Sequence, residues 1–242
     1  MPSTGPFVAI ETSSSPGSVA VGTPPDDLRE FAFPAGSDHG RGLIPALVTL
    51  TEAAGWPLAE TTLVSVAIGP GPFTGLRVGV TTAKAIAWSA GCPVAAIPTA
   101  TCLAAQAVAA GSPKGPVQVV FDAGRGELFV VTASPAGPPG APDAGNWWQL
   151  HVTGLQKPEA WRDSLPRGAA VTGSGLALAD PLLTGLPDTR PDLWIAAPAD
   201  RQPTASTVAR LGLAAAERNE LFDAVAVKPI YLRASYAEEK KG

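Results

Sequence analysis

The stretch Gly69–Lys84, GPGPFTGLRVGVTTAK, joins a predicted buried strand at Leu63–Ile68 to a predicted helix at Leu76–Ala90. Glycine adopts backbone angles with φ > 0 without strain, and proline holds its own φ at about −65°. The stretch therefore predicts a rigid corner between strand and helix. Such a corner presents a helix N-terminus, where free N–H groups and the helix dipole favour anions.

The corner matches neither of the two common phosphate-binding motifs. A Walker loop ends in Gly-Lys-Ser or Gly-Lys-Thr, whereas Gly75 is followed by Leu76 and Arg77. The dinucleotide motif is G-x-G-x-x-G, and the last gap in this chain is longer. Pro70 and Pro72 also lack the N–H groups that a phosphate cradle uses. A structural corner is therefore favoured over a phosphate site.

Composition predicts a globular protein of one large domain or two lobes. The chain has 242 residues, of which 45% are hydrophobic and 16% charged, with a net charge of −4. This composition excludes a disordered chain and argues against unaided binding to nucleic acid. Cys92, Cys102, His39 and His151 match no metal-binding spacing. Without a signal-peptide pattern or a long apolar run, we expect a cytoplasmic protein that does not enter a membrane.

The hydrophobic pattern predicts two α/β lobes. The order of strands and helices starts again at Val117, which suggests an architectural duplication into lobes at 1–112 and 113–242, with the last helix returning to the first lobe. Predicted strands are Phe7–Glu11, Ser18–Gly22, Glu30–Phe33, Leu63–Ile68, Val94–Ile97, Val117–Asp122, Glu127–Thr132, Ala169–Thr172 and Ile230–Arg233. Predicted helices are Leu43–Ala54, Leu76–Ala90, Ala100–Ala110, Pro158–Ser164 and Ala205–Asn219, and a Pro/Gly loop begins at Ser134.

Two early helices carry more apolar and small residues than a single packing stripe needs. In Leu76–Ala90, Arg77 and Lys84 share one stripe with Thr81 and Trp88. A protein partner can bury the opposite arc, or the two helices can form a layer inside their own lobe. The candidate partner-interface residues are Leu43, Leu47, Leu50, Gly79, Val80, Ala83, Ile86 and Ala87.

Two carboxylates lie at predicted turns. Glu11 ends a strand before the hydroxyl-rich turn Thr12–Ser15. It can hold a Mg²⁺–phosphate group through water or cap the N–H groups of the turn, and capping is favoured. Asp122, near Arg125 and Glu127, is either a site residue or part of an ion pair that closes a hairpin. The ion pair is favoured.

Six segments, taken together and in order, carry a resemblance to a known family. The most specific is GPGPFTGLRVG, and the others are FVAIETSSSPGSVAVG, DHGRGLIPAL, VAAIPTATCLA, FDAGRGELFVV and KPIYLR. Over Phe7–Arg233 the chain resembles the TsaB (YeaZ) family, whose members assist the synthesis of threonylcarbamoyladenosine in bacterial tRNA.

The resemblance implies an α/β, two-lobed actin-like or Hsp70-like (ASKHA) fold with a mixed sheet in each lobe. It implies a non-catalytic partner and activator of the threonylcarbamoyltransferase TsaD, which binds through the two early helices or, alone, forms a homodimer. No cofactor is expected to bind tightly, ATP or ADP with Mg²⁺ would sit at an interface shared with the partner, and tRNA would be met only through the complex. The degenerate nucleotide site is assigned to Glu11, Thr12, Ser13, Gly71, Thr74, Gly75 and Asp122.

The chain departs from the family pattern at Glu11, where Asp is usual, and at Pro72, where Ser is usual. In alignment with TsaD, Thr99 and Leu103 stand where that enzyme has its metal-binding histidines. Neither residue can replace a histidine ligand, which favours an accessory role and argues against a metallopeptidase. The alternative function is an autonomous actin-fold ATPase or phosphotransferase that uses Glu11 and Asp122.

Overall fold

The computed structural model describes residues 5–24, 27–34, 36, 39–113, 115–136 and 148–231. The chain divides into two compact units, residues 1–102 with 203–242, and residues 103–202. The second unit is therefore an insertion in the first, and the chain passes into it within helix α3 (Thr99–Ala109). The lobe boundary predicted near residue 112 stays a prediction.

The first unit contains a mixed five-stranded sheet in the order β3-β2-β1-β4-β5. β1 pairs antiparallel with β2 and parallel with β4, so the hairpin at the start of the chain joins a parallel arrangement in mid-sheet. The strands are β1 (Phe7–Glu11), β2 (Ser18–Thr23), β3 (Asp27–Ala32), β4 (Leu63–Gly69) and β5 (Val94–Pro98).

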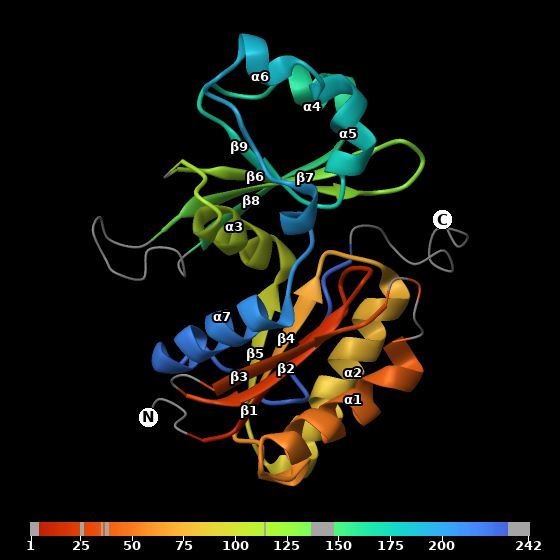
Figure 1. The fold of residues 1–242 in the computed structure, drawn as a ribbon, viewed down its shortest axis with the longest axis vertical. Helices are drawn as coiled ribbons and strands as arrows, with labels where there is room; N and C mark the ends of the chain where they lie inside the picture. Colours follow the sequence, from red (N-terminus) through yellow and green to blue (C-terminus); the bar gives the residue numbers. More distant parts are fainter. Residues whose placement is uncertain are drawn as a thin grey trace. The chain divides into compact units, whose positions relative to one another are not determined.

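Helices cover both faces of this sheet (Figure 1). α1 (His39–Ala53) and α2 (Phe73–Ala90) lie on one face, and α7 (Ala205–Glu217) lies on the other. α7 approaches closely because Gly212 has no side chain; a Cβ there would lie 1.8 Å from Ser65 Oγ. The apolar face of β1 and β4 and the inner sides of α1 and α2 form one core cluster.

The second unit repeats the architecture of the first. Its sheet has the order β10-β9-β6-β7-β8, so the five strands, numbered along the chain, have the same neighbours and orientations as those of the first sheet. The strands are β6 (Val117–Asp122), β7 (Leu128–Pro135), β8 (Trp148–Gln156), β9 (Ala170–Thr172) and β10 (Trp194–Ile195). α4 (Pro158–Asp163) and α5 (Leu176–Leu183) pack around the buried Trp161, and α6 (Leu186–Thr189) follows.

Sequence periodicity located most of these elements but missed β8, β10, α5 and α6. β8 escaped notice because most of its side chains are exposed and the apolar signal is weak. The strand predicted at Ile230–Arg233 is wrong for its first two residues, which lie outside any strand. Residues 232–233, and positions 137–147 of the predicted Pro/Gly loop, lie outside the described residues.

Candidate functional site

Glu11 lies fully buried at the end of β1, where it accepts three hydrogen bonds. The backbone N–H of Ser13, at 2.6 Å, and the Ser13 hydroxyl both donate to Oε1, and the Ser14 hydroxyl donates to Oε2 at 2.6 Å. Thr99, the first residue of α3, donates through Oγ1 to the Ser13 hydroxyl at 2.8 Å. The carboxylate caps the turn, as the favoured alternative expected, and ties it to the start of α3.

Burial is the largest influence on the pKa of the Glu11 carboxyl group. Desolvation raises the pKa of Glu11 to about 7, although the hydrogen bonds from Ser13 and Ser14 lower it, and the charge of Glu30 raises it further. On the neighbouring helix α3, burial raises the pKa of the Cys102 thiol, and the charge of Glu11 adds to that shift. Glu11 is therefore held in an environment that favours its neutral form near pH 7.

The glycine corner packs directly on the turn that follows Glu11. A Cβ at Gly71 would lie 2.2 Å from the Ser13 carbonyl oxygen, and one at Gly79 would lie 2.1 Å from Thr12 Oγ1. Thr12 Oγ1 also donates to the Gly75 carbonyl oxygen at 2.8 Å. The glycines thus admit the chain's own turn, because any larger residue would collide with it.

Six of the seven residues assigned to the degenerate nucleotide site lie at or beside this contact in the first unit. Thr74 is exposed in the first turn of α2. The seventh, Asp122, lies in the second unit and is exposed; its Oδ1 accepts the Gly124 N–H at 2.8 Å. Beside it, Glu127 forms an ion pair with Lys157 at 3.6 Å. Asp122 therefore caps a turn, and the hairpin ion pair stays a prediction.

The residues predicted to contact a partner belong to the core of the first unit. Their side chains face their own sheet and each other, and seven of the eight are buried while Leu50 is half-buried. The set comprises Leu43, Leu47, Leu50, Gly79, Val80, Ala83, Ile86 and Ala87. The face assigned to a partner is thus the internal face, which corrects the choice of residues. Whether α1 and α2 bind a partner stays a prediction.

Other side chains occupy the outer faces of these helices. Ile44 on α1 is 43% exposed, and Trp88 on α2 is 80% exposed. Phe222 and Val225, from the segment that follows α7, are 47% and 75% exposed. Trp88 stands in the stripe that the sequence marked as polar, whereas Phe222 and Val225 had no local pattern to identify them.

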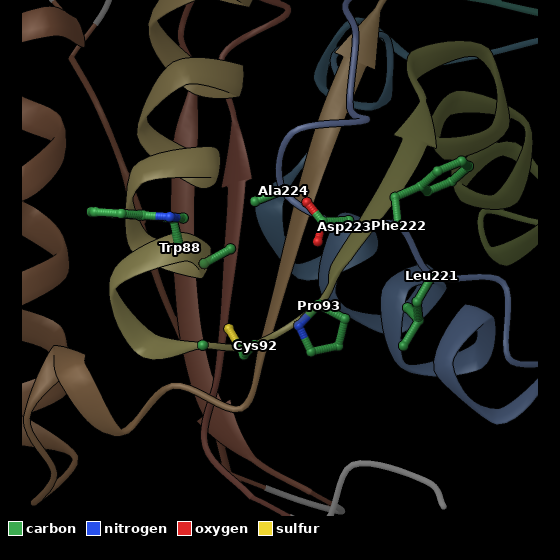
Figure 2. A pocket seen from close by; sticks show the side chains of 9 residues that line it. Trp88, Cys92, Pro93, Leu221, Phe222, Asp223 and Ala224 are labelled. Carbon is green, nitrogen blue, oxygen red and sulfur yellow. The ribbon is translucent and has the colours of Figure 1, made fainter.

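A pocket of about 450 Å³ lies between the C-terminal end of α2 and the segment after α7. Figure 2 shows the Trp88 indole directed away from Asp223 and Phe222. The pocket is lined by Ala87, Trp88, Gly91, Cys92, Pro93, Leu221, Phe222, Asp223 and Ala224. No local sequence pattern indicates this pocket, because its two walls are far apart in the chain.

Comparisons of the sequence with known proteins find relatives of part of this chain. A family model described as TsaD, tRNA N6-adenosine threonylcarbamoyltransferase, matches residues 34–136. The tRNA threonylcarbamoyladenosine biosynthesis protein TsaB of Bacillus subtilis (strain 168) is 30% identical over 123 residues, which are 51% of this chain and 52% of that protein. An uncharacterized protein of Mycobacterium tuberculosis (strain ATCC 25618 / H37Rv) is 33% identical over 91 residues, 38% of this chain and 40% of that one.

Solved structures support the same relationship at the level of the fold. YeaZ from Pseudomonas aeruginosa superposes with a TM-score of 0.70 and 21% identity, covering 93% of this chain and 99% of that one. A second structure is of an uncharacterized protein with similarity to peptidase YEAZ from Pseudomonas aeruginosa. It superposes with a TM-score of 0.71 and 21% sequence identity, covering 94% of this chain and 99% of that one. The chain is therefore similar to TsaB in sequence over about half its length, and to YeaZ in fold over nearly all of it.

The fold is that of YeaZ, and it contains the predicted mixed sheet in each of its two units. In sequence, the matches span about half the length of the curated TsaB relative and less of the mycobacterial one. Among the described residues, no three His, Cys, Asp or Glu side chains are grouped to hold a metal ion. No helix in the described part of the chain has the length and apolar character needed to cross a bilayer.

The interior position of Val80 predicts a loss of stability in the isolated chain. Val80→Ala removes buried methyl groups from the core and should lower the free energy of unfolding by about 2 kcal/mol. Ile44→Ala, on the outer face of α1, should change it by less than about 0.5 kcal/mol. Urea unfolding of the two variants makes the comparison, and equal, negligible effects would contradict the interior assignment.

Glu11 predicts a pH-dependent stability. Because its pKa is higher in the folded chain than the ordinary 4.5, its contribution is fully present below about pH 4.5 and is lost as the pH rises through about 7. Between pH 5 and pH 8 the loss should be about 2.5 kcal/mol. Glu11→Gln should flatten the stability profile over that range, as measured by denaturation at each pH. Glu52→Gln, an exposed change on α1, is the matched control and should leave the profile unchanged.

The contact between Thr12 and Gly79 predicts a rescue. Gly79→Ala should lower the melting temperature, since the new Cβ collides with Thr12 Oγ1. Thr12→Ala removes that oxygen, and the nearest remaining Thr12 atom, Cβ, lies 3.4 Å away, an ordinary contact. The double variant should therefore be more stable than Gly79→Ala alone by about 1 kcal/mol or more. Strictly additive melting shifts would argue against this contact.

Proposed function

We propose that this chain is a non-catalytic partner and activator of a TsaD-type threonylcarbamoyltransferase, in the formation of threonylcarbamoyladenosine at adenosine 37 of tRNA. The similarity to TsaB supports the pathway. The accessory role rests on one observation in particular, the engagement of Glu11 and the glycine corner by the chain itself.

A carboxylate that acts on a substrate must come within hydrogen-bond reach of it. Glu11 has no exposed surface, and its two oxygens already accept bonds from Ser13 and Ser14. The backbone that would cradle a phosphate at Gly71 instead contacts Ser13. These contacts favour the accessory role over the autonomous ATPase or phosphotransferase, which needs Glu11 available to a ligand.

The outer faces of α1 and α2 are the surface that we propose for the TsaD-type partner. Ile44 and Trp88 supply large apolar side chains there, and exposed aromatic residues are typical anchors of protein interfaces. The same faces would pair two copies of the chain when the partner is absent. ATP or ADP with Mg²⁺ would bind at the surface shared with the partner, and tRNA would be contacted through the complex.

Reconstitution tests this function. The reaction contains the purified TsaD-type protein, a threonylcarbamoyl donor and unmodified tRNA, with and without this chain, and the modified nucleoside is measured by mass spectrometry. We expect product only when the chain is present, and Glu11→Gln and Asp122→Asn should keep at least half of the stimulation. Loss of stimulation in Glu11→Gln, together with ATP turnover by the isolated wild-type chain, would support the phosphotransferase instead.

Binding measurements with the purified TsaD-type protein locate the partner surface. Ile44→Glu and Trp88→Ala should each weaken binding to the partner by about tenfold or more, measured by calorimetry, with unchanged melting temperatures. Val152→Ser, an exposed change in the second unit, is the control. Unchanged affinity in both helix variants would refute the surface while leaving the accessory role open to the product assay.

A further inference from the structure

The segment Leu221–Tyr231, here called the strap, crosses the first unit after α7. Near its start, Phe222 and Val94 exchange two backbone hydrogen bonds, with N···O distances of 2.8 and 2.9 Å. At its other end, the N–H of Ile230 donates to the Ile68 carbonyl oxygen at 2.7 Å. The strap is thus tied to the beginning of β5 and to the end of β4.

Lys84 of α2 holds the middle of the strap. Its Nζ donates to the carbonyl oxygens of Val225 and Val227, each at 3.2 Å. The strap turns here, because the Asp223 carboxylate accepts the Val225 N–H at 2.9 Å. Only Ala224 and Val227 enter the core beside α2, whereas Val225 points outward and is 75% exposed.

The far end of the strap contacts the first turns of α2. The Tyr231 ring packs on Phe73 at 4.8 Å between centroids, and its hydroxyl accepts a bond from Arg77 Nε at 3.3 Å. A Cβ at Gly69 would lie 2.3 Å from the Ile230 carbonyl oxygen. The charged stripe of α2 therefore faces the strap, and its two cations both bind it.

We propose that the strap is a latched element of the first unit, able to open locally while the sheet stays folded, and that Lys84 is its latch. Segments with few buried side chains and few backbone bonds open at a lower free energy than the core. The strap has this character, since two of its side chains are anchored in the core and its ends are held by three backbone bonds.

Lys84 is decisive among the strap contacts. Hydrogen bonds from an ammonium group are stronger than those between neutral groups, and this ammonium binds two carbonyls at once. Arg77 makes one solvent-exposed bond to the strap, at 3.3 Å, whereas one of the two Lys84 bonds is partly buried. The two backbone ties lie at the ends of the strap, and Lys84 is the polar contact that holds the part between them.

Opening has a consequence for the surface beside Trp88. The strap residues Leu221, Phe222, Asp223 and Ala224 form one wall of the pocket near the end of α2, so opening removes that wall. It also uncovers Val227, which is buried in the closed strap. The latch would therefore control how much apolar surface the first unit presents at this place. The latch would act in the chain alone, without a TsaD-type partner.

Hydrogen exchange of the full-length chain tests the latch. In the wild type, the amides of Phe222, Ile230 and Val94 should exchange faster than the amide of Ile10 in mid-sheet, which reports unfolding of the whole unit. Lys84→Met keeps the aliphatic stem but removes the donors, and should speed exchange at the three strap-linked amides by about tenfold with Ile10 unchanged.

Two further variants complete the design. Lys84→Arg restores donors and should bring exchange back to within about threefold of the wild type, a recovery that lost packing alone would not give. Ala85→Ser, an exposed change on α2 outside that stripe, should have no effect. The proposal is overturned if strap-linked amides and Ile10 exchange at one rate in the wild type, if Lys84→Met accelerates all of them equally, or if it changes none.

Discussion

The first unit depends on the contact between the turn after β1 and the glycine corner before α2. Ser13 touches Gly71 through its backbone carbonyl, and Thr12 fills the space beside Gly79 while bonding to Gly75. This contact sets how closely α2 approaches the end of β1. It also seals Glu11 from solvent, because the turn that covers the corner is the turn that the carboxylate caps.

Using the buried Glu11 carboxylate to hold that turn lowers the stability of the fold at neutral pH. A buried carboxylate with a pKa near 7 opposes folding once it ionises, so simple stability does not account for an acid here. What Glu11 contributes is the fixed position of the groups that it hydrogen-bonds. The Glu11 carboxylate accepts hydrogen bonds from the hydroxyls of both Ser13 and Ser14. The Ser13 hydroxyl in turn accepts a hydrogen bond from Thr99 at the start of α3. A polar network of this kind specifies one arrangement of strand end, turn and helix start, which an apolar side chain of the same size does not.

Local patterns predicted the elements of the fold better than the surfaces between them. The strand before the corner, the corner and α2 follow from apolar runs and from Gly and Pro positions. The repeated order of elements indicated two related α/β units, and the structure adds that their sheets share one strand order. The broad apolar arc of α2 is compatible with a partner or with a layer inside the lobe, and the structure buries it in the core of the first unit. In the structure α2 contacts the sheet, α1 and the strap, and three neighbours bury a wider arc than a single sheet does.

The strap and the pocket wall that it forms could not be predicted from the sequence. Its bonds join residues more than a hundred positions apart, and its cation-binding groups are backbone carbonyls of Val225 and Val227, which every residue type offers. A lysine in a polar helical stripe is ordinarily a solvated residue, so nothing local distinguishes Lys84. Because the strap lies along that stripe, whatever approaches the exposed end of α2 at Trp88 also meets Phe222 and Val225. The outer surface of α2 is therefore shared between the helix and the end of the chain, and the state of the strap becomes a property of any interface formed there.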